Sequence, residues 1–165
     1  VSRAFVNEDD QREAPFVPPR ADLPDGVPNY VTPEGMALLL QEKEALQAEL
    51  KALTAGDILD KQNAISVVNT RLQMLNNRIS SAQVIGHEKI SPGEVSFGSA
   101  ITIRFKGVAT EQKFRIVGVD EADLKQGKMA FTSPLARLLM HKKAGDSAVL
   151  KTAGGERVIE ILAVE

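Results

Sequence analysis

The sequence contains no cysteine, no tryptophan, one tyrosine and two histidines. Without cysteine there is neither a disulfide framework nor a thiolate metal site, which fits a reducing compartment. The histidines, His87 and His141, have no partner at the spacing of metal ligands. No apolar run approaches the ~20 residues of a membrane span, and the first residues lack the charged-then-apolar order of a signal peptide. We therefore expect a soluble, cytoplasmic protein with little enzymatic equipment.

Neither sign of charge dominates the chain, which has 22 acidic and 20 basic residues. A chain with balanced charge is not expected to have a broad positive surface that attracts polyanions, so the composition does not indicate a protein that binds free nucleic acid. The length of 165 residues suits one or two small domains.

A helical rhythm organises residues 32–85. In its first half, apolar residues recur at alternating spacings of three and four, and only Lys43 interrupts them; the second half repeats the rhythm without a break. A heptad seam in each arm predicts an antiparallel coiled-coil hairpin. The two seams match if the chain folds back near residue 59, and a register one heptad tighter would put the turn at Gly56. The seam residues are Met36, Leu39, Leu46, Leu50, Leu53, Ile65, Val68, Leu72, Leu75, Ile79 and Ala82.

The break between the arms contains Gly56, Asp57 and Asp60. Gly56 suits the left-handed position that ends a helix. Asp57 suits the cap of the next helix, and Asp60 favours the positive end of its dipole. The alternative is that the two carboxylates hold a divalent cation at the end of the arm, with another molecule supplying most of the ligands. The residues alone leave both interpretations open.

Residues 1–31 contain most of the prolines and show no sustained period. Such a segment buries too little apolar surface to offset the entropy lost on ordering. We expect a flexible proline-rich tail over residues 1–31, with a short partner-binding motif around Phe16–Pro19 as the alternative. Thr32 then suits the cap of the first helix and Pro33 its first position, whereas Gly35 is unexpected so early in a helix.

After Gly86 the period changes from helical to two. Residues 100–105, 113–117 and 157–164 alternate, and glycines separate them as turns. One short helix interrupts the strands, with Ser133 as its cap and Pro134 at its first position. The pattern predicts an antiparallel sheet with one short helix, an α+β domain over residues 86–165.

Several motifs in both halves of the chain occur in the order found in a known family. A single motif would be weak evidence, but the ordered set closely resembles the Gre factors of bacterial RNA polymerase over most of the chain after residue 30. The motifs are Ser81–Ile85, Phe114–Gly118 with Asp120–Asp123, Ser133–Arg137 and Lys151–Glu156.

The resemblance implies an FKBP-like C-terminal domain that docks on the rim of the polymerase secondary channel, around Thr132, Ser133 and Pro134. It implies that the coiled coil enters the channel and that Asp57 and Asp60 help to hold a Mg²⁺ jointly with RNA polymerase. The isolated protein then needs no metal or cofactor and has no catalytic residues of its own. It contacts nucleic acid only within the transcription complex, touches no membrane and is a monomer.

The tip departs from the family pattern, which reads Asp-x-x-Glu-Asn-Ala. Asp57 and Asp60 keep two acids three residues apart, but Lys61 and Gln62 follow them. Alignment on the later Asn63-Ala64 would instead remove both acids. The arms are also about one heptad shorter than is typical, a loss of ~10 Å of reach.

Two modes of action therefore stay open: assistance to cleavage of backtracked RNA, and a non-cleaving regulator that occupies the channel. A prolyl isomerase is an alternative from another class, because the FKBP-like fold is shared with such enzymes. Its active site would need an aromatic-lined pocket, and four phenylalanines without tryptophan are better explained as a core. A coiled-coil adaptor for another partner is the remaining alternative. The phenylalanines are Phe97, Phe105, Phe114 and Phe131.

Overall fold

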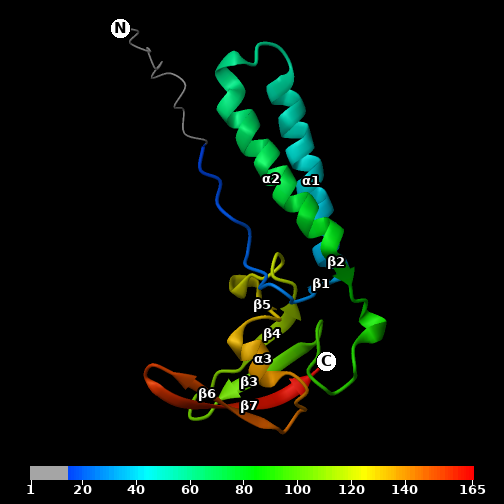
Figure 1. The fold of residues 1–165 in the computed structure, drawn as a ribbon. Helices are drawn as coiled ribbons and strands as arrows, with labels where there is room; N and C mark the ends of the chain where they lie inside the picture. The colour runs from blue at the N-terminus through cyan, green and yellow to red at the C-terminus, as the bar shows by residue number, and fades with distance from the viewer. Residues whose placement is uncertain (1–14) are drawn as a thin grey trace.

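The computed structural model describes residues 15–165, and residues 1–14 lie outside the described part. A long helical hairpin projects from a curved sheet, and residues 15–28 run beside the hairpin towards its base (Figure 1). The predicted α+β class, with a helical hairpin followed by a sheet and one short helix, is confirmed.

The hairpin consists of α1 (Pro33–Thr54) and α2 (Gln62–Ser81), with the 3-10 turn η2 (Leu59–Lys61) between them. The 22 residues of α1 extend ~33 Å at 1.5 Å per residue. Because α1 ends at Thr54 and α2 begins only at Gln62, the chain folds back close to the predicted residue 59. The tighter alternative, centred on Gly56, is not the one formed.

Thr32 begins α1 as predicted. Its hydroxyl accepts a hydrogen bond from Gly35 N at 2.9 Å, and Pro33 takes the first helical position. At the other end Gly56 adopts a φ of +91°, a conformation that residues with a Cβ rarely adopt. The residue types at both ends of α1 therefore account for its limits.

The heptad seam forms the apolar core of the hairpin. Leu39, Leu46, Val68 and Leu75 are at most 3% exposed. The other seam residues pack against them in partly buried positions: Met36, Leu50, Leu53, Leu72, Ile79 and Ala82. The spacing of apolar residues thus predicted the interface between the two helices correctly.

The second half of the chain forms a five-stranded sheet with the order β5-β4-β3-β7-β6. Its pairs are antiparallel except for β4 and β5, which are parallel, so the sheet is mixed where a wholly antiparallel one was predicted. The connection from β4 to β5 includes the short turn η4 (Leu124–Gln126), which lets the chain re-enter the sheet in the same direction. The strands are β3 (Ala100–Phe105), β4 (Gln112–Val117), β5 (Lys128–Ala130), β6 (Ser147–Thr152) and β7 (Gly155–Val164).

The helix α3 (Pro134–Leu139) packs on this sheet through Ala136 and Leu139, both 0% exposed. Residues from all five strands complete the core, including Ile103 and Ile159. Another short turn, η3 (His87–Lys89), lies on the chain between the hairpin and the sheet. Residues 86–165, here called the sheet domain, therefore have an apolar core separate from that of the hairpin.

A two-stranded parallel sheet joins the base of the hairpin, formed by β1 (Asn29–Val31) and β2 (Ala82–Val84). Asn29 and Val31 are each 3% exposed. The predicted boundary of the tail at residue 31 is therefore too late, because the last three residues of that segment pair with β2 and pack beneath the helices. The expected flexibility of residues 1–14 lies outside the described residues.

Within residues 15–165, no helix is both long enough and apolar enough to cross a membrane.

Candidate functional site

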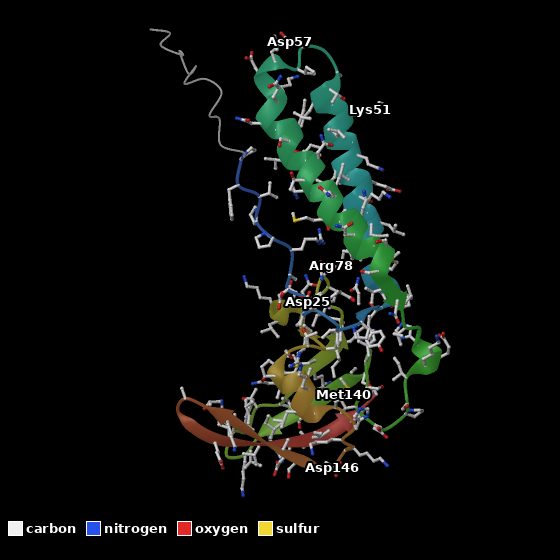
Figure 2. The ribbon with its side chains drawn as sticks, in the orientation of Figure 1. Asp25, Lys51, Asp57, Arg78, Met140 and Asp146 are labelled. Atoms are coloured by element: carbon white, nitrogen blue, oxygen red, sulfur yellow. The ribbon has the colours of Figure 1, made fainter. Side chains whose placement is uncertain are left out.

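The two predicted carboxylates lie at the tip of the hairpin. Asp57 is in the connection between the helices and Asp60 is in η2, and both are exposed. Figure 2 shows Asp57 at the end of the hairpin farthest from the sheet. Two apolar residues separate them in sequence, Ile58 at 44% exposed and Leu59 at 70%. The tip is therefore an exposed surface that is both acidic and apolar.

Asp57 does not cap α2, which corrects one of its two predicted roles. Its Oδ1 accepts a hydrogen bond from Leu59 N at 3.1 Å and so supports the turn that leads into η2. Helix α2 begins later, with Lys61 at its N-cap position and no side-chain cap. The additional 3-10 turn lies between Asp57 and α2, so Asp57 precedes the N-cap position by four residues instead of occupying it.

The tip carboxylates do not form a complete metal site. Mg²⁺ prefers six oxygen ligands, and residues 15–165 contain no cluster of three or more His, Cys, Asp or Glu side chains that could hold a metal ion. Asp57 and Asp60 fit a magnesium ion only as part of a shell that another molecule completes.

The predicted docking loop lies at the start of α3. Ser133 Oγ accepts a hydrogen bond from Ala136 N at 3.2 Å and caps the helix, and Pro134 takes its first position. Thr132 and Ser133 are half-buried and Pro134 is exposed. The capping role predicted from the sequence is thus formed, and it leaves one face of the loop accessible.

An apolar cavity of about 510 Å³ adjoins this loop, a feature that the sequence did not indicate. Leu124, on the edge of the cavity, is 69% exposed. All residues that line the cavity belong to the sheet domain, whereas the tip is the end of the hairpin that points away from that domain (Figure 1). The lining residues are Phe114, Leu124, Met129, Ser133, Pro134, Leu135 and Leu150.

The junction between the hairpin and the sheet domain explains the unexpected glycine of α1. Thr32 Oγ1 donates a hydrogen bond to Glu121 Oε2 at 2.5 Å, and Lys128 Nζ lies 3.7 Å from the other carboxylate oxygen. A Cβ at Gly35 would lie 2.6 Å from Glu121 Oε2. Gly35 is therefore needed so that the buried carboxylate can reach the helix cap.

Aromatic packing reinforces the same junction. Tyr30 of β1 packs against Phe97 and Phe131, with ring centroids 5.7 and 5.6 Å away. A Cβ at Gly118 would lie 2.5 Å from Tyr30 O, so this glycine allows the β1 backbone to approach the sheet domain. These rings fill the space between the two parts of the molecule, as expected for a structural role.

An arginine of the N-terminal segment adds charge to the junction. Hydrogen bonds from Arg20 lower the pKa of Glu42 below its ordinary value, and the bond to Glu42 in turn raises the pKa of Arg20. Sequence reasoning missed Arg20 and Glu121, because partners 22 and 89 residues away leave no local pattern.

The fold and its two exposed ends define a class: a protein that presents the tip of a helical hairpin on a small α+β domain. The family model described as "Transcription elongation factor, GreA/GreB, C-term" matches residues 90–165. Transcription elongation factor GreA of Hyphomonas neptunium is 33% identical over 153 residues, which cover 79% of this chain and 98% of that protein. GreA of Xylella fastidiosa is 35% identical over 136 residues, or 77% of this chain and 85% of that protein.

Among solved structures, GreA factor homolog 1 (Gfh1) of Thermus thermophilus is similar over 82% of this chain and 97% of its own, at 20% identity and a TM-score of 0.39. The sequence matches to the two GreA proteins, each above 30% identity, cover more than three quarters of this chain and most of each relative. This chain belongs to the GreA/GreB family of transcription elongation factors.

Proposed function

We propose that the protein binds bacterial RNA polymerase with its sheet domain and inserts the hairpin into the secondary channel. The observation that carries this proposal is the separation of two exposed surfaces: an acidic and apolar tip on a hairpin ~33 Å long, and a loop beside an apolar cavity on the sheet domain. The protein acts as a cytoplasmic monomer, contacts nucleic acid only within the transcription complex and has no enzymatic activity of its own.

The docking surface is the loop of Thr132, Ser133 and Pro134 together with the neighbouring cavity. An apolar side chain of the polymerase rim that entered the cavity would be removed from water, which stabilises a complex by ~25 cal/mol per Å² of apolar surface. The exposed Leu124 supplies further apolar contact area.

Occupation of the channel is the mode of action that the tip supports best. Leu59, at 70% exposed, suits an apolar contact within the channel. Asp57 already accepts a hydrogen bond from the backbone of its own turn, which engages one of its oxygens. Lys61 and Gln62 stand where the family pattern has Asn-Ala. A tip of this kind obstructs the channel without adding a complete catalytic group.

Assistance to transcript cleavage is the second candidate, because two exposed carboxylates, Asp57 and Asp60, are presented at the tip. They would serve as ligands in a magnesium shell that polymerase carboxylates complete. A bound magnesium ion supplies Lewis-acid activation of water for attack on the phosphodiester.

Cleavage of a stalled complex separates the two modes. Asp57→Asn with Asp60→Asn should spare polymerase binding and change the helix ends by at most ~1 kcal/mol, since Asn is also a good hydrogen-bond acceptor. We expect the wild type to alter elongation at saturation without releasing 3′ fragments of RNA, and the double variant to behave in the same way. Cleavage by the wild type that the double variant loses would instead establish the carboxylates as metal ligands. A failure of the wild type to bind core polymerase would contradict both modes.

A further inference from the structure

The N-terminal segment from Pro15 to Pro28, here called the strap, runs beside α2 before it enters β1 (Figure 1). Its central residue is Arg20, whose side chain is 17% exposed. Two nitrogens of Arg20 donate to the two oxygens of Glu42 on α1, at 2.8 and 3.0 Å. Its Nε donates to Asp120 Oδ1 of the sheet domain at 3.0 Å. One guanidinium therefore connects the hairpin to the sheet domain.

Arg78 of α2, labelled near the sheet-domain end of the hairpin in Figure 2, also contacts Asp120. Its Nε lies 3.3 Å from Asp120 Oδ2, and its Nη2 donates to the carbonyl of Ala21 in the strap at 2.6 Å. Asn29 Nδ2 donates to the carbonyl of Arg78 at 2.8 Å. The positive charges of Arg20 and Arg78 thus balance the negative charges of Glu42 and Asp120. Asp120, whose side chain is 7% exposed, is the most buried of these four residues.

Beneath the strap the packing is loose. A cavity of about 530 Å³ lies between Val17 and Pro18 of the strap and Val67 and Met74 of α2. Among the described residues, Asp120 Oδ2 and Arg78 Nη1 are buried and have no hydrogen-bond partner. Asp120 Oδ2 nevertheless lies in the ion pair with Arg78 Nε. The strap is therefore held to the hairpin mainly by charge and hydrogen bonds, and apolar contact contributes less.

Glu42 lies well above the foot of the hairpin, so its contact with Arg20 can oppose a tilt of the helices. The bonds of Thr32 and of β1 hold the foot of the hairpin, where a tilt moves the backbone little, and the ion pair of Arg78 with Asp120 joins α2 directly to the sheet domain. Glu42 lies nine residues beyond Pro33, which is ~13 Å along the axis. A contact at that height opposes a tilt far more effectively, and a tilt of ~10° would move the tip of a helix ~33 Å long by ~6 Å.

We infer that the strap sets the angle of the hairpin relative to the sheet domain, with Arg20 as the positioning residue. The restraint is electrostatic: Arg20 binds Glu42 on α1 and Asp120 on the sheet domain at once. Loss of these bonds leaves α1 unrestrained above its foot, with only the Arg78–Asp120 ion pair on α2 opposing a tilt. The inference goes beyond the proposed function, because it concerns the free protein and holds whether or not the hairpin enters a channel.

The natural absence of cysteine allows a direct measurement on the full chain. Lys51→Cys near the tip and Arg137→Cys on α3, both at exposed positions, would carry two spin labels. Their distance distribution is then recorded for the otherwise wild-type chain, for Arg20→Gln and for Glu42→Gln. Arg71→Gln is the matched control: Arg71 lines the same cavity and its charge helps to lower the pKa of Glu42, but it forms no ion pair within residues 15–165, so this variant removes a nearby positive charge without removing a bond.

We expect a narrow distribution for the wild type and for Arg71→Gln, and a distribution broadened or shifted by ~5 Å or more for Arg20→Gln and Glu42→Gln. In 1 M NaCl, where the screening length is ~3 Å, the wild type should broaden towards the variants. Circular dichroism at the same temperature establishes that each variant is folded, and Glu42→Gln keeps a helix-forming residue on the surface of α1. A folded Arg20→Gln or Glu42→Gln whose distribution matches that of the wild type would overturn the inference.

Discussion

Gly35 shows how one residue can join two parts of a molecule. In a helix a glycine costs ~1 kcal/mol relative to alanine, yet here its missing Cβ leaves room for the Glu121 carboxylate against the Thr32 hydroxyl. The sequence marked this glycine as unexpected. It could not supply the reason, because Thr32 and Glu121 are 89 residues apart.

We predict that Gly35→Ala destabilises the protein by ~1 kcal/mol in chemical denaturation. The lost hydrogen bond to a charged group is worth ~1.5–3 kcal/mol, which exceeds the ~1 kcal/mol of helix propensity that alanine adds. In a Glu121→Ala background the same substitution should stabilise the protein, because the contact with the carboxylate is gone and the Thr32 hydroxyl, 3.2 Å from the added Cβ, no longer has the carboxylate as its partner and can rotate away. Equal stabilisation in both backgrounds would show that the carboxylate does not restrict this position.

Lys43 is the one charged residue in the heptad seam and is half-buried. In such a position we expect the apolar stem to pack in the seam while the ammonium reaches water, a common arrangement for long basic side chains. Lys43→Leu should therefore raise the midpoint of thermal unfolding, through ~1 kcal/mol of added apolar burial. Lys51→Leu, at an exposed position of the same helix, should not. A fall in the midpoint for Lys43→Leu would mean that the ammonium itself stabilises the hairpin.

At the scale of secondary structure, the elements with a strong period were predictable and the short ones were not. The hairpin follows from apolar residues that recur every 3.5 positions, a signal that no other element produces. The three-residue strands β1 and β2 carry no detectable period, so their pairing and the end of the predicted tail were missed. The turn η2 and the parallel pairing of β4 with β5 depend on tertiary context and likewise leave no sequence pattern.

The proposed contact with RNA polymerase depends on the loop at the start of the short helix α3. We predict that Ser133→Arg weakens binding to core polymerase at least tenfold, because a long charged side chain would cover the edge of the apolar cavity. Ser133→Ala is the control: it removes the same cap, at ~1 kcal/mol, but leaves the surface open. Binding measured by fluorescence anisotropy should be close to wild type for Ser133→Ala. Equal affinities for all three proteins, with intact unfolding transitions, would exclude the loop as the docking surface.

On the scale of the whole molecule, two apolar cores are joined by a polar and aromatic junction. Each core is continuous within its own part, whereas the junction depends on Thr32 with Glu121, on the packing of Tyr30, and on Arg20 with Asp120. This division explains why composition and period predicted the two parts but not their attachment. It also makes the direction of the hairpin, and hence the position of its tip, a property of a few side chains.

The central claim is that the tip enters the secondary channel of RNA polymerase, and a cross-link from the tip tests it most directly. A photoreactive amino acid would replace Leu59, which is 70% exposed, with the exposed Lys151 of β6 as the control position. In a stalled, backtracked complex we predict that the probe at residue 59 cross-links the 3′-terminal nucleotides of the transcript and the probe at residue 151 does not. A chain that binds the complex with full affinity but cross-links no transcript from residue 59 would contradict the account.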